Sequence, residues 1–235
     1  DSNIFVLSNP KQQIILNSKQ WEVENPKLLY VNLEDKKVYP SLKMQTDSSA
    51  IQIFSNEVDG LHQYACQFEN VFLTSLFRTS LLPGYPSGII SGQLSYGTNE
   101  EAEKNIITDL QFSNVEWNEV GFGLIDVKGN LKSDTIGSTA IDMLTRIDSS
   151  KIDLKYNQSA DESRSLSTNF TSLPLSIFQP FLVKHLSEMN GNISGNFNIS
   201  NEGKGDMDGT LNFNGASLRI NMLNSMYKLP DEHVQ

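Results

Sequence analysis

The residues that could perform nucleophilic, acid–base or metal chemistry are few and scattered. The three histidines, His62, His185 and His233, lie far apart, and none belongs to an H-x-x-x-H or H-x-E pair. Cys66 is the only cysteine and has no patterned partner, so the sequence predicts neither a thiolate metal cluster nor a disulfide framework. The chain carries no G-x-S-x-G elbow, phosphate-binding loop or dinucleotide-binding fingerprint.

Two acidic groups are the remaining candidates for chemistry. Asp206-Met-Asp208-Gly209 resembles half of a calcium loop, but it lacks the other acidic positions, and hairpin turns use the same residue types. Glu100-Glu-Ala-Glu103-Lys104 offers paired carboxylates, whereas glycosidase carboxylates occupy a sheltered cleft lined by aromatic residues. We therefore expect a solvated loop there, no cofactor or metal, and a protein that is not an enzyme.

The elements that surround these residues are predicted to be β-strands. Apolar and polar residues alternate in many short segments, as expected for strands with one buried face, for example Ile51-Gln-Ile53, Leu94-Ser-Tyr96, Leu110-Gln-Phe112, Ile152-Asp-Leu154, Phe197-Asn-Ile199, Leu211-Asn-Phe213 and Leu218-Arg-Ile220-Asn-Met222. Turn signals separate them, at residues 56–60, 83–86, 128–130, 201–205 and 208–209. The pattern predicts a mainly β protein built as a meander of many short strands.

The composition excludes several classes of partner. The 235 residues include 38% hydrophobic residues and carry a net charge of −10, which argues against nucleic acid because phosphate backbones bind clustered Lys and Arg. An anionic membrane surface would also repel the chain. No stretch reaches the 18 apolar residues of a membrane span, and no signal peptide is visible. Because the sequence begins Asp-Ser-Asn, we expect a fragment whose parent carries any anchor elsewhere.

The chain nearly repeats itself. The segment that starts at Phe68 matches the segment that starts at Phe170, a spacing of 102 residues, and the match continues from Leu110-Gln-Phe112 to Leu211-Asn-Phe213. This repeat predicts a leading segment at residues 1–67, a first unit at 68–169 and a truncated second unit at 170–235, all within one elongated domain.

Each unit is predicted to begin with an apolar cap. Leu73 to Leu82 and Ser176 to Met189 place apolar residues at three- and four-residue spacing, which favours one or two short helices. Pro180 would fall in the first turn of the second helix, where its missing N–H costs little. A Gly-x-x-x-Gly element follows each cap, at Gly88 and Gly191, where the glycines suit a positive φ or a bulge.

The alternating residues define a candidate binding surface. In register, seven of them would form an unbroken apolar stripe: Phe197, Ile199, Leu211, Phe213, Leu218, Ile220 and Met222. Two interpretations stay open, the core of a closed sandwich or barrel and a trough left open along one side. Unpaired end strands would promote edge-to-edge self-association of the fragment.

The C-terminal third carries a resemblance to a known family. Leu173-Pro-Leu, Gln179-Pro-Phe181, Gly191-Asn-Ile-Ser-Gly195, Asp208-Gly-Thr-Leu and Leu223-Asn-Ser-Met-Tyr227 occur in the order found at the C-terminal end of TamB-like proteins, which belong to the AsmA-like family. Upstream, Trp21-Glu-Val-Glu-Asn-Pro26, Gly88-Ile-Ile-Ser-Gly92 and Val120-Gly-Phe-Gly-Leu124 are similar to the versions of this family in Bacteroides-like bacteria. The link at 201–205 is shorter than usual, and a glycine usual near Phe54-Ser55 is absent.

The resemblance implies a β-taco, a long curved sheet folded into a trough with an apolar lining. It implies a non-catalytic periplasmic segment of a protein anchored in the inner membrane by a segment outside this chain. It also implies phospholipid transport to the outer membrane through contact with acyl chains, or assistance to outer-membrane protein assembly together with a TamA-like barrel.

Another class of function fits the same residues. An extracellular β-solenoid or sandwich would bind a polysaccharide or a protein partner through surface loops, and it predicts a closed core with exposed aromatic residues near Tyr64, Tyr85 and Tyr96. A β-helical polysaccharide-degrading enzyme has less support, because no convincing acid–base pair is present.

Overall fold

The structure is a computed structural model. It describes residues 4–8, 13–17, 19–24, 27–32, 37–58, 61–76, 86–98, 103–118, 120–182, 185–201, 206–229 and 233–234.

Strands make up almost all of the described chain. The early strands are β1 (Ile4–Ser8), β2 (Gln13–Leu16), β3 (Lys19–Val23), β4 (Lys27–Asn32), β5 (Lys37–Gln45), β6 (Ala50–Val58) and β7 (Leu61–Phe72). The central strands are β8 (Ser87–Thr98), β9 (Lys104–Trp117), β10 (Val120–Ser133), β11 (Thr139–Ile147), β12 (Ser150–Gln158) and β13 (Arg164–Pro174). The last are β14 (Leu186–Ser200), β15 (Asp206–Ile220), β16 (Ser225–Lys228) and β17 (His233–Val234). The helical elements are α1 (Leu73–Leu76), η1 (Leu175–Phe178), α2 (Gln179–Leu182) and η2 (Asn221–Leu223).

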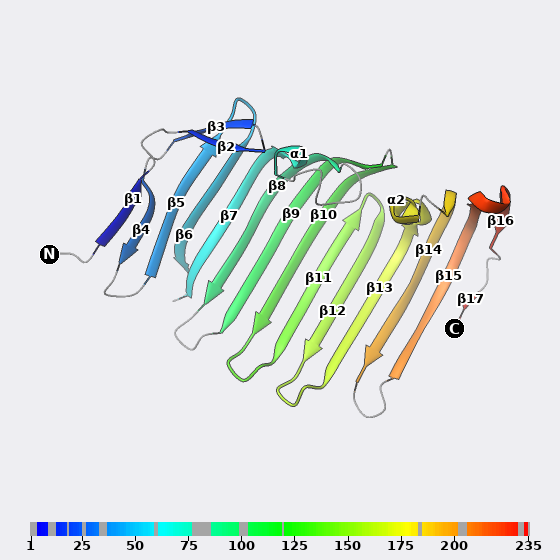
Figure 1. The fold of residues 1–235 in the computed structure, drawn as a ribbon. Coiled ribbons are helices and arrows are strands. Elements are labelled where there is room, and N and C mark those ends of the chain that lie inside the picture. The colour runs from blue at the N-terminus through cyan, green and yellow to red at the C-terminus, as the bar shows by residue number, and fades with distance from the viewer. Residues whose placement is uncertain are drawn as a thin grey trace.

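All these strands belong to one extended antiparallel sheet. From β4 to β16 each strand pairs with the next along the chain, and the two ends of the chain lie at opposite ends of the sheet (Figure 1). No pairing between described strands joins the first strands to the last, so the sheet is open. The prediction of a mainly β, extended curved sheet with one or two short helices is confirmed.

The caps gather at one end of the strands. The β2–β3 hairpin crosses the ends of β5 to β7, while α1, η1 and α2 lie beside it along the same border (Figure 1). We call this border the capped end and the opposite border the uncapped end. Both buried apolar clusters lie at the capped end, one around Trp21, Val71 and Leu73 and the other around Leu173 and Leu175.

Two predicted turns are wrong because their residues lie inside strands. Gly129 of the 128–130 signal is in the middle of β10, opposite Thr108 and Met143. Gly209 is in β15, opposite Phe197, and a Cβ at this glycine would lie 2.6 Å from the carbonyl oxygen of Asn196 and 3.2 Å from the Phe197 ring. Glycine is therefore needed here for the close approach of the neighbouring strand's backbone, which a single sequence cannot distinguish from a turn.

The predicted helices are shorter than expected. The second one comprises only η1 and α2, and Leu186 to Met189 begin β14 instead, since this segment pairs with Leu218 to Ile220 of β15. Of the first predicted helix, Leu73 to Leu76 form α1, and residues 77–82 lie outside the described residues.

The near-repeat corresponds to a repeated backbone irregularity. The pairing of β7 with β8 shifts between Phe68 and Val71, and the pairing of β13 with β14 shifts between Phe170 and Leu173. Each shift contains a residue with positive φ, Asn70 at 49° and Ser172 at 51°. Each bulge is followed directly by a helical cap.

Candidate functional site

The strand register sorts the side chains onto two faces of the sheet. Residues directly opposite each other in an antiparallel pair lie on the same face. One row starts at Ile53 in β6 and ends at Gly209 in β15, and it carries no charged side chain. It passes through Cys66, Leu94, Thr108, Gly129, Met143, Leu154, Thr168 and Phe197. We call this side of the sheet the apolar face.

A second row of the apolar face lies two residues nearer the uncapped end. It starts at Ser55 and continues through Tyr64, Tyr96, Ile106, Leu131, Ile141, Tyr156, Leu166, Ile199 and Met207. The two rows cross ten strands from β6 to β15, which at about 4.8 Å per spacing extends about 43 Å. The apolar face is therefore long enough for a chain-like apolar ligand.

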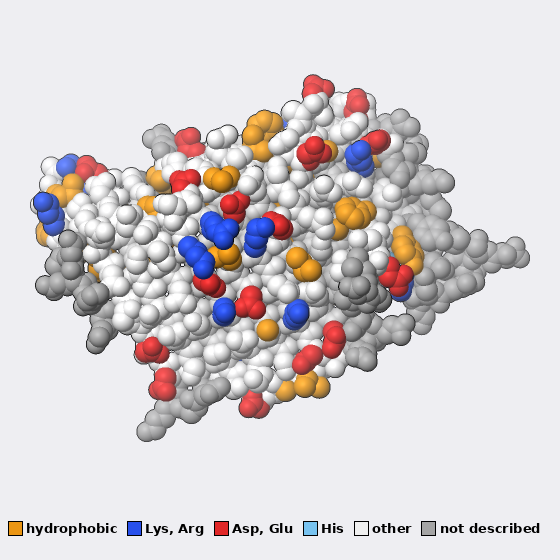
Figure 2. Space-filling view, turned by 180° about the vertical axis from the view of Figure 1, so that it is seen from behind, with side chains coloured by type: hydrophobic (Ala, Val, Ile, Leu, Met, Phe, Trp, Pro, Cys, Tyr) orange, Lys and Arg blue, Asp and Glu red, His pale blue; other side chains and the backbone are white. Residues whose placement is uncertain are grey.

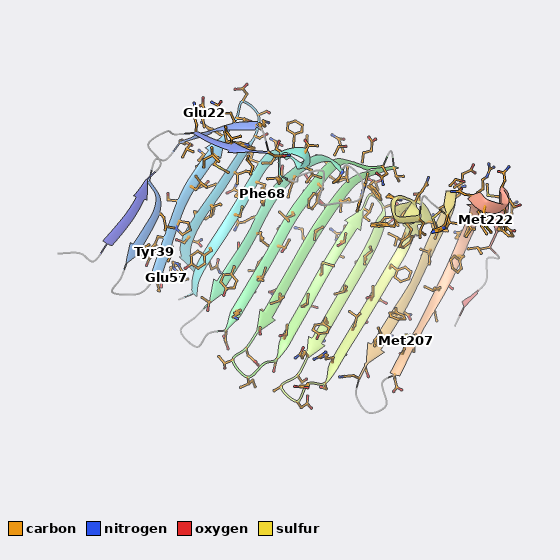
Figure 3. The ribbon with its side chains drawn as sticks, in the orientation of Figure 1. Glu22, Tyr39, Glu57, Phe68, Met207 and Met222 are labelled. Carbon is orange, nitrogen blue, oxygen red and sulfur yellow. The ribbon has the colours of Figure 1, made fainter. Side chains whose placement is uncertain are left out.

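The apolar face is covered at the capped end and uncovered elsewhere. Trp21 and Val71, at the capped end, are completely buried. In contrast, Leu94 is 40% exposed, Ile199 39% and Met207 70%. No described helix packs over these three residues, and Figure 3 shows Met207 near the uncapped end of β15.

The residues predicted to line the trough fall into three groups. Phe197, Ile199, Leu211 and Phe213 lie on the apolar face, the last two packing against the buried cluster of β13 and β14. Leu218 and Ile220 lie at the capped end, opposite Met189 and Leu186.

Met222 is different from the other six. The strand ends at Ile220, and Met222 lies in η2 with 88% of its surface exposed (Figure 3). The alternation suggested that the strand continues to Met222, but the chain turns at this point and reverses into β16.

An aromatic group on β5, β7 and β8 forms the N-terminal part of the apolar face. The ring of buried His62 packs edge-on between Tyr39 and Tyr64, with centroids 5.0 and 4.8 Å away, and Tyr64 is stacked with Tyr96 at 6.3 Å. The Nε2 atom of His62 lies 3.2 Å from the carbonyl oxygen of Val38. His62 and Tyr64 are two residues apart in β7 and share one face, whereas the meeting of Tyr39 with His62 was not predicted, because it depends on how β5 is placed beside β7.

Cys66 also lies on the apolar face, between Ile53 and Leu94 in the first row. It is a half-buried free thiol, and desolvation by burial raises the pKa of the Cys66 thiol above its ordinary value. A thiol with a raised pKa is a poor nucleophile, so its surroundings do not favour covalent chemistry.

The opposite face of the sheet is polar. Lys128 bonds Asp109 of the neighbouring strand at 3.0 Å, and Gln111 donates to Asp126 at the same distance. Figure 2 shows this face, with Lys and Arg side chains interspersed among Asp and Glu over the middle of the sheet. Such exposed pairs contribute little stability, and they keep this face in water.

The acidic candidates for chemistry do not converge. Asp206 and Asp208 lie in β15 rather than in a loop, and Asp208 accepts a hydrogen bond from Asn198 at 3.2 Å. Of the other predicted group, only Glu103 and Lys104 are described, and Lys104 begins β9. Over the described ranges, no set of three or more His, Cys, Asp and Glu side chains is placed to hold a metal ion.

Two hollows of the surface are lined mainly by polar residues. One of about 480 Å³ lies at the uncapped end and is lined by Lys104, Lys132, Asp134 and neighbouring residues. Another of about 620 Å³ lies on the polar face over β7 to β9, where Gln67, Gln93 and Asp109 line it.

Together the fold and the site define an open antiparallel sheet with one apolar and one polar face. Comparison of the chain with protein-family models, with curated proteins and with solved structures finds no match in any of the three. No helix among the described residues is long and apolar enough to cross a membrane.

Proposed function

We propose that this protein is a non-catalytic lipid-binding segment whose apolar face shields the acyl chains of phospholipids. The observation that supports this proposal is the uncovered pair of apolar rows, in which Leu94, Ile199 and Met207 remain exposed although large side chains surround them. Apolar patches of this extent are rare on soluble proteins unless they bind something.

The expected affinity for an acyl chain is strong enough to measure and weak enough to be reversible. Each methylene that leaves water contributes about 0.8 kcal/mol, so five buried methylenes contribute about 4 kcal/mol and ten about 8 kcal/mol. These free energies correspond to dissociation constants of about 1 mM and about 1 μM. A ligand with one or two long acyl chains would therefore bind measurably yet leave again, as transport requires.

The polar border of the apolar face suits a phosphate headgroup. Lys104 of β9 is opposite Thr98, and Arg164 of β13 is opposite Gln158, so both cations lie at the uncapped end on the same side as the apolar rows. A phospholipid with its acyl chains on the rows would keep its phosphate in water near one of these side chains.

The biological setting follows from the resemblance to TamB-like proteins. In this proposal the chain is a periplasmic part of an envelope-spanning protein held in the inner membrane by another segment. Acyl chains would move along the rows toward the outer membrane, where a TamA-like barrel is the expected partner. Assistance to the assembly of outer-membrane proteins would use the same uncovered surface.

Binding of a phospholipid with an environment-sensitive fluorophore on one acyl chain tests the proposal. The native protein should shift the emission to the blue in a saturable way. The double variant Leu94→Asp/Ile199→Asp should bind at least tenfold more weakly, because two charges would lie in the apolar rows. The matched control is Ile107→Asp, since Ile107 is 42% exposed on the polar face of β9 and should tolerate the charge without loss of binding.

Equal binding by the native protein and the double variant would contradict the proposal, provided that circular dichroism shows both to be folded. The aromatic group around Tyr96 supports an alternative, a polysaccharide that stacks on exposed rings. Glycan-array binding that disappears in Tyr96→Ala, without any lipid uptake by the native protein, would favour this alternative.

A further inference from the structure

Two hairpins at the capped end have the same geometry and the same role. The β2–β3 hairpin and the β9–β10 hairpin each turn through two residues, and each turn begins with an asparagine in the left-handed conformation, Asn17 at φ 48° and Asn118 at φ 49°. The spacing of the two asparagines is 101 residues, close to that of the near-repeat. Both hairpins are covered by the helical cap that follows them.

The first hairpin packs against α1. Trp21 of β3 is completely buried in a cluster with Leu73 of α1, and Leu16 of β2 packs against the same cluster. The side-chain amide of Asn17 donates a hydrogen bond to the carbonyl oxygen of Thr74, also in α1.

The second hairpin packs against α2 in the same way. The Trp117 ring of β9 contacts the Phe181 ring edge-on at a centroid distance of 4.9 Å. The side-chain amide of Asn118 donates to the carbonyl oxygen of Pro180 at 3.5 Å, and Phe122 of β10 is buried. Each cap therefore offers apolar side chains to the hairpin and a backbone carbonyl to its asparagine.

A third hairpin, formed by β15 and β16, shares some of these features and has no cap over it. Its turn is longer because η2 forms it, and its left-handed asparagine, Asn224 at φ 45°, ends the turn, whereas Asn17 and Asn118 begin theirs. Met222, Leu223, Met226 and Tyr227 are 88%, 50%, 43% and 43% exposed. Within the described part of the chain, Asn224 makes no side-chain hydrogen bond, and no helical element other than η2, which contains Met222 and Leu223, lies at these four residues.

We propose that the β15–β16 hairpin is a docking surface for the cap segment of a further repeat unit. Its occupant is an apolar helical turn of the chemistry of residues 172–182, with Leu and Phe side chains against Leu223 and Tyr227 and a backbone carbonyl that accepts from Asn224. A second copy of this chain is a poor occupant, because its own caps are already packed on its own hairpins. The surface lies at the capped end, beyond the two apolar rows, so the inference does not rest on the proposed function.

A peptide with the sequence of residues 172–182, Ser-Leu-Pro-Leu-Ser-Ile-Phe-Gln-Pro-Phe-Leu, tests the inference when it carries a fluorescent label and is added to the whole chain. We expect a saturable rise in fluorescence anisotropy that a scrambled peptide does not give. The variant Leu223→Asp/Tyr227→Asp should bind at least tenfold more weakly. Asn224→Gly keeps the left-handed turn but removes the amide, and should bind about fivefold more weakly, as expected for one hydrogen bond.

Two control variants separate this surface from others. Ile136→Asp changes a residue that is 70% exposed in the turn between β10 and β11, and Leu94→Asp changes the apolar face. Both should bind the peptide like the native chain. Absence of saturable binding would overturn the inference, and so would a loss of binding in Leu94→Asp with none in Leu223→Asp/Tyr227→Asp. Concentration-dependent dimerisation of the native chain that disappears in Leu223→Asp would identify a second copy as the occupant and would also overturn it.

Discussion

At the scale of single residues, Cys66 is the most useful reporter of the apolar face. It lies in the first row between Ile53 and Leu94, and it is the only thiol in the chain. Any ligand that covers the row has to contact or shield it. The thiol therefore reports on the burial of the apolar face, through its pKa, and on whether a ligand covers that face.

Burial that raises the pKa of the Cys66 thiol has a predictable effect on stability. Below the pKa of the unfolded chain, about 8.5, the thiol is protonated in both states and contributes nothing. As the pH rises above that value the unfolded chain releases its proton first, so the free energy of unfolding falls. Urea unfolding at pH 7 and pH 9.5 should show a larger loss of stability in the native chain than in Cys66→Ala.

Alkylation of the same thiol gives an independent measurement. At pH 8 Cys66 should react more slowly in the folded chain than in the urea-unfolded chain, and more slowly again after a phospholipid is added. An identical alkylation rate in all three samples would contradict the environment described for this residue.

Sequence alternation predicted which residues share a face of the sheet where a strand continues, and failed where the strand ends. Phe197, Ile199 and Leu211 lie on the apolar face as alternation indicated. Met222 continues the same alternation in the sequence but lies in η2. Alternation records only which residues could share a face, whereas the end of a strand depends on where its partner turns.

At the scale of elements, the bulge that precedes each cap is held by the same pair of side-chain bonds. At the bulge before α1, buried Ser49 donates to the carbonyl oxygen of Asn70 at 2.8 Å, and the N–H of Asn70 donates to Ser91 Oγ at 3.1 Å. The carbonyl oxygen and the N–H of Asn70 lose their partners in the neighbouring strands where the register shifts, and the two serines form hydrogen bonds with them instead.

The bulge before η1 has an equivalent arrangement. Ser150, which is 3% exposed, donates to the carbonyl oxygen of Ser172 at 2.7 Å, and the N–H of Ser172 donates to Ser194 Oγ at 2.8 Å. These serines gave no signal in the sequence, since they are scattered among many other polar residues. Their role appears only when three neighbouring strands are in register.

Removal of one of these serines should destabilise the protein. Ser150→Ala removes the hydrogen bond that buried Ser150 donates to the Ser172 carbonyl, which should lower the free energy of unfolding by about 0.5–1.5 kcal/mol. The exposed Ser159 is a matched control, and Ser159→Ala should change it by less than about 0.5 kcal/mol. Chemical denaturation measures both. Equal stabilities of the two variants would mean that the bulge does not need its serine.

At the scale of the whole molecule, the sheet is stabilised unequally along its strands. Except for Ala65, the buried apolar residues lie toward the capped end, and the rows beyond them have no second layer. Repeat proteins of this kind bury their core only between neighbouring elements and can open locally.

Hydrogen exchange should therefore follow a gradient along each strand. In β8 the amide of Ile90, which is 5% exposed, should exchange more slowly than the amide of Tyr96, which is 37% exposed. The same order should hold in β14 for Ile193 and Ile199. Bound phospholipid should slow exchange at the uncapped positions and leave Ile90 and Ile193 unchanged. Uniform exchange along β8 and β14 would contradict this description.

The sequence by itself determined the strand content, the alternation that gives two unlike faces, and the near-repeat, because side-chain period and turn chemistry are local properties of the chain. It placed Phe197 and Ile199 on one face, but it could not decide between a closed core and an open sheet. That choice depends on whether the end strands pair with each other, which is a contact between residues far apart in the chain. The tertiary structure decided it: β1 and β17 lie at opposite ends of one sheet (Figure 1), so the apolar face is left open.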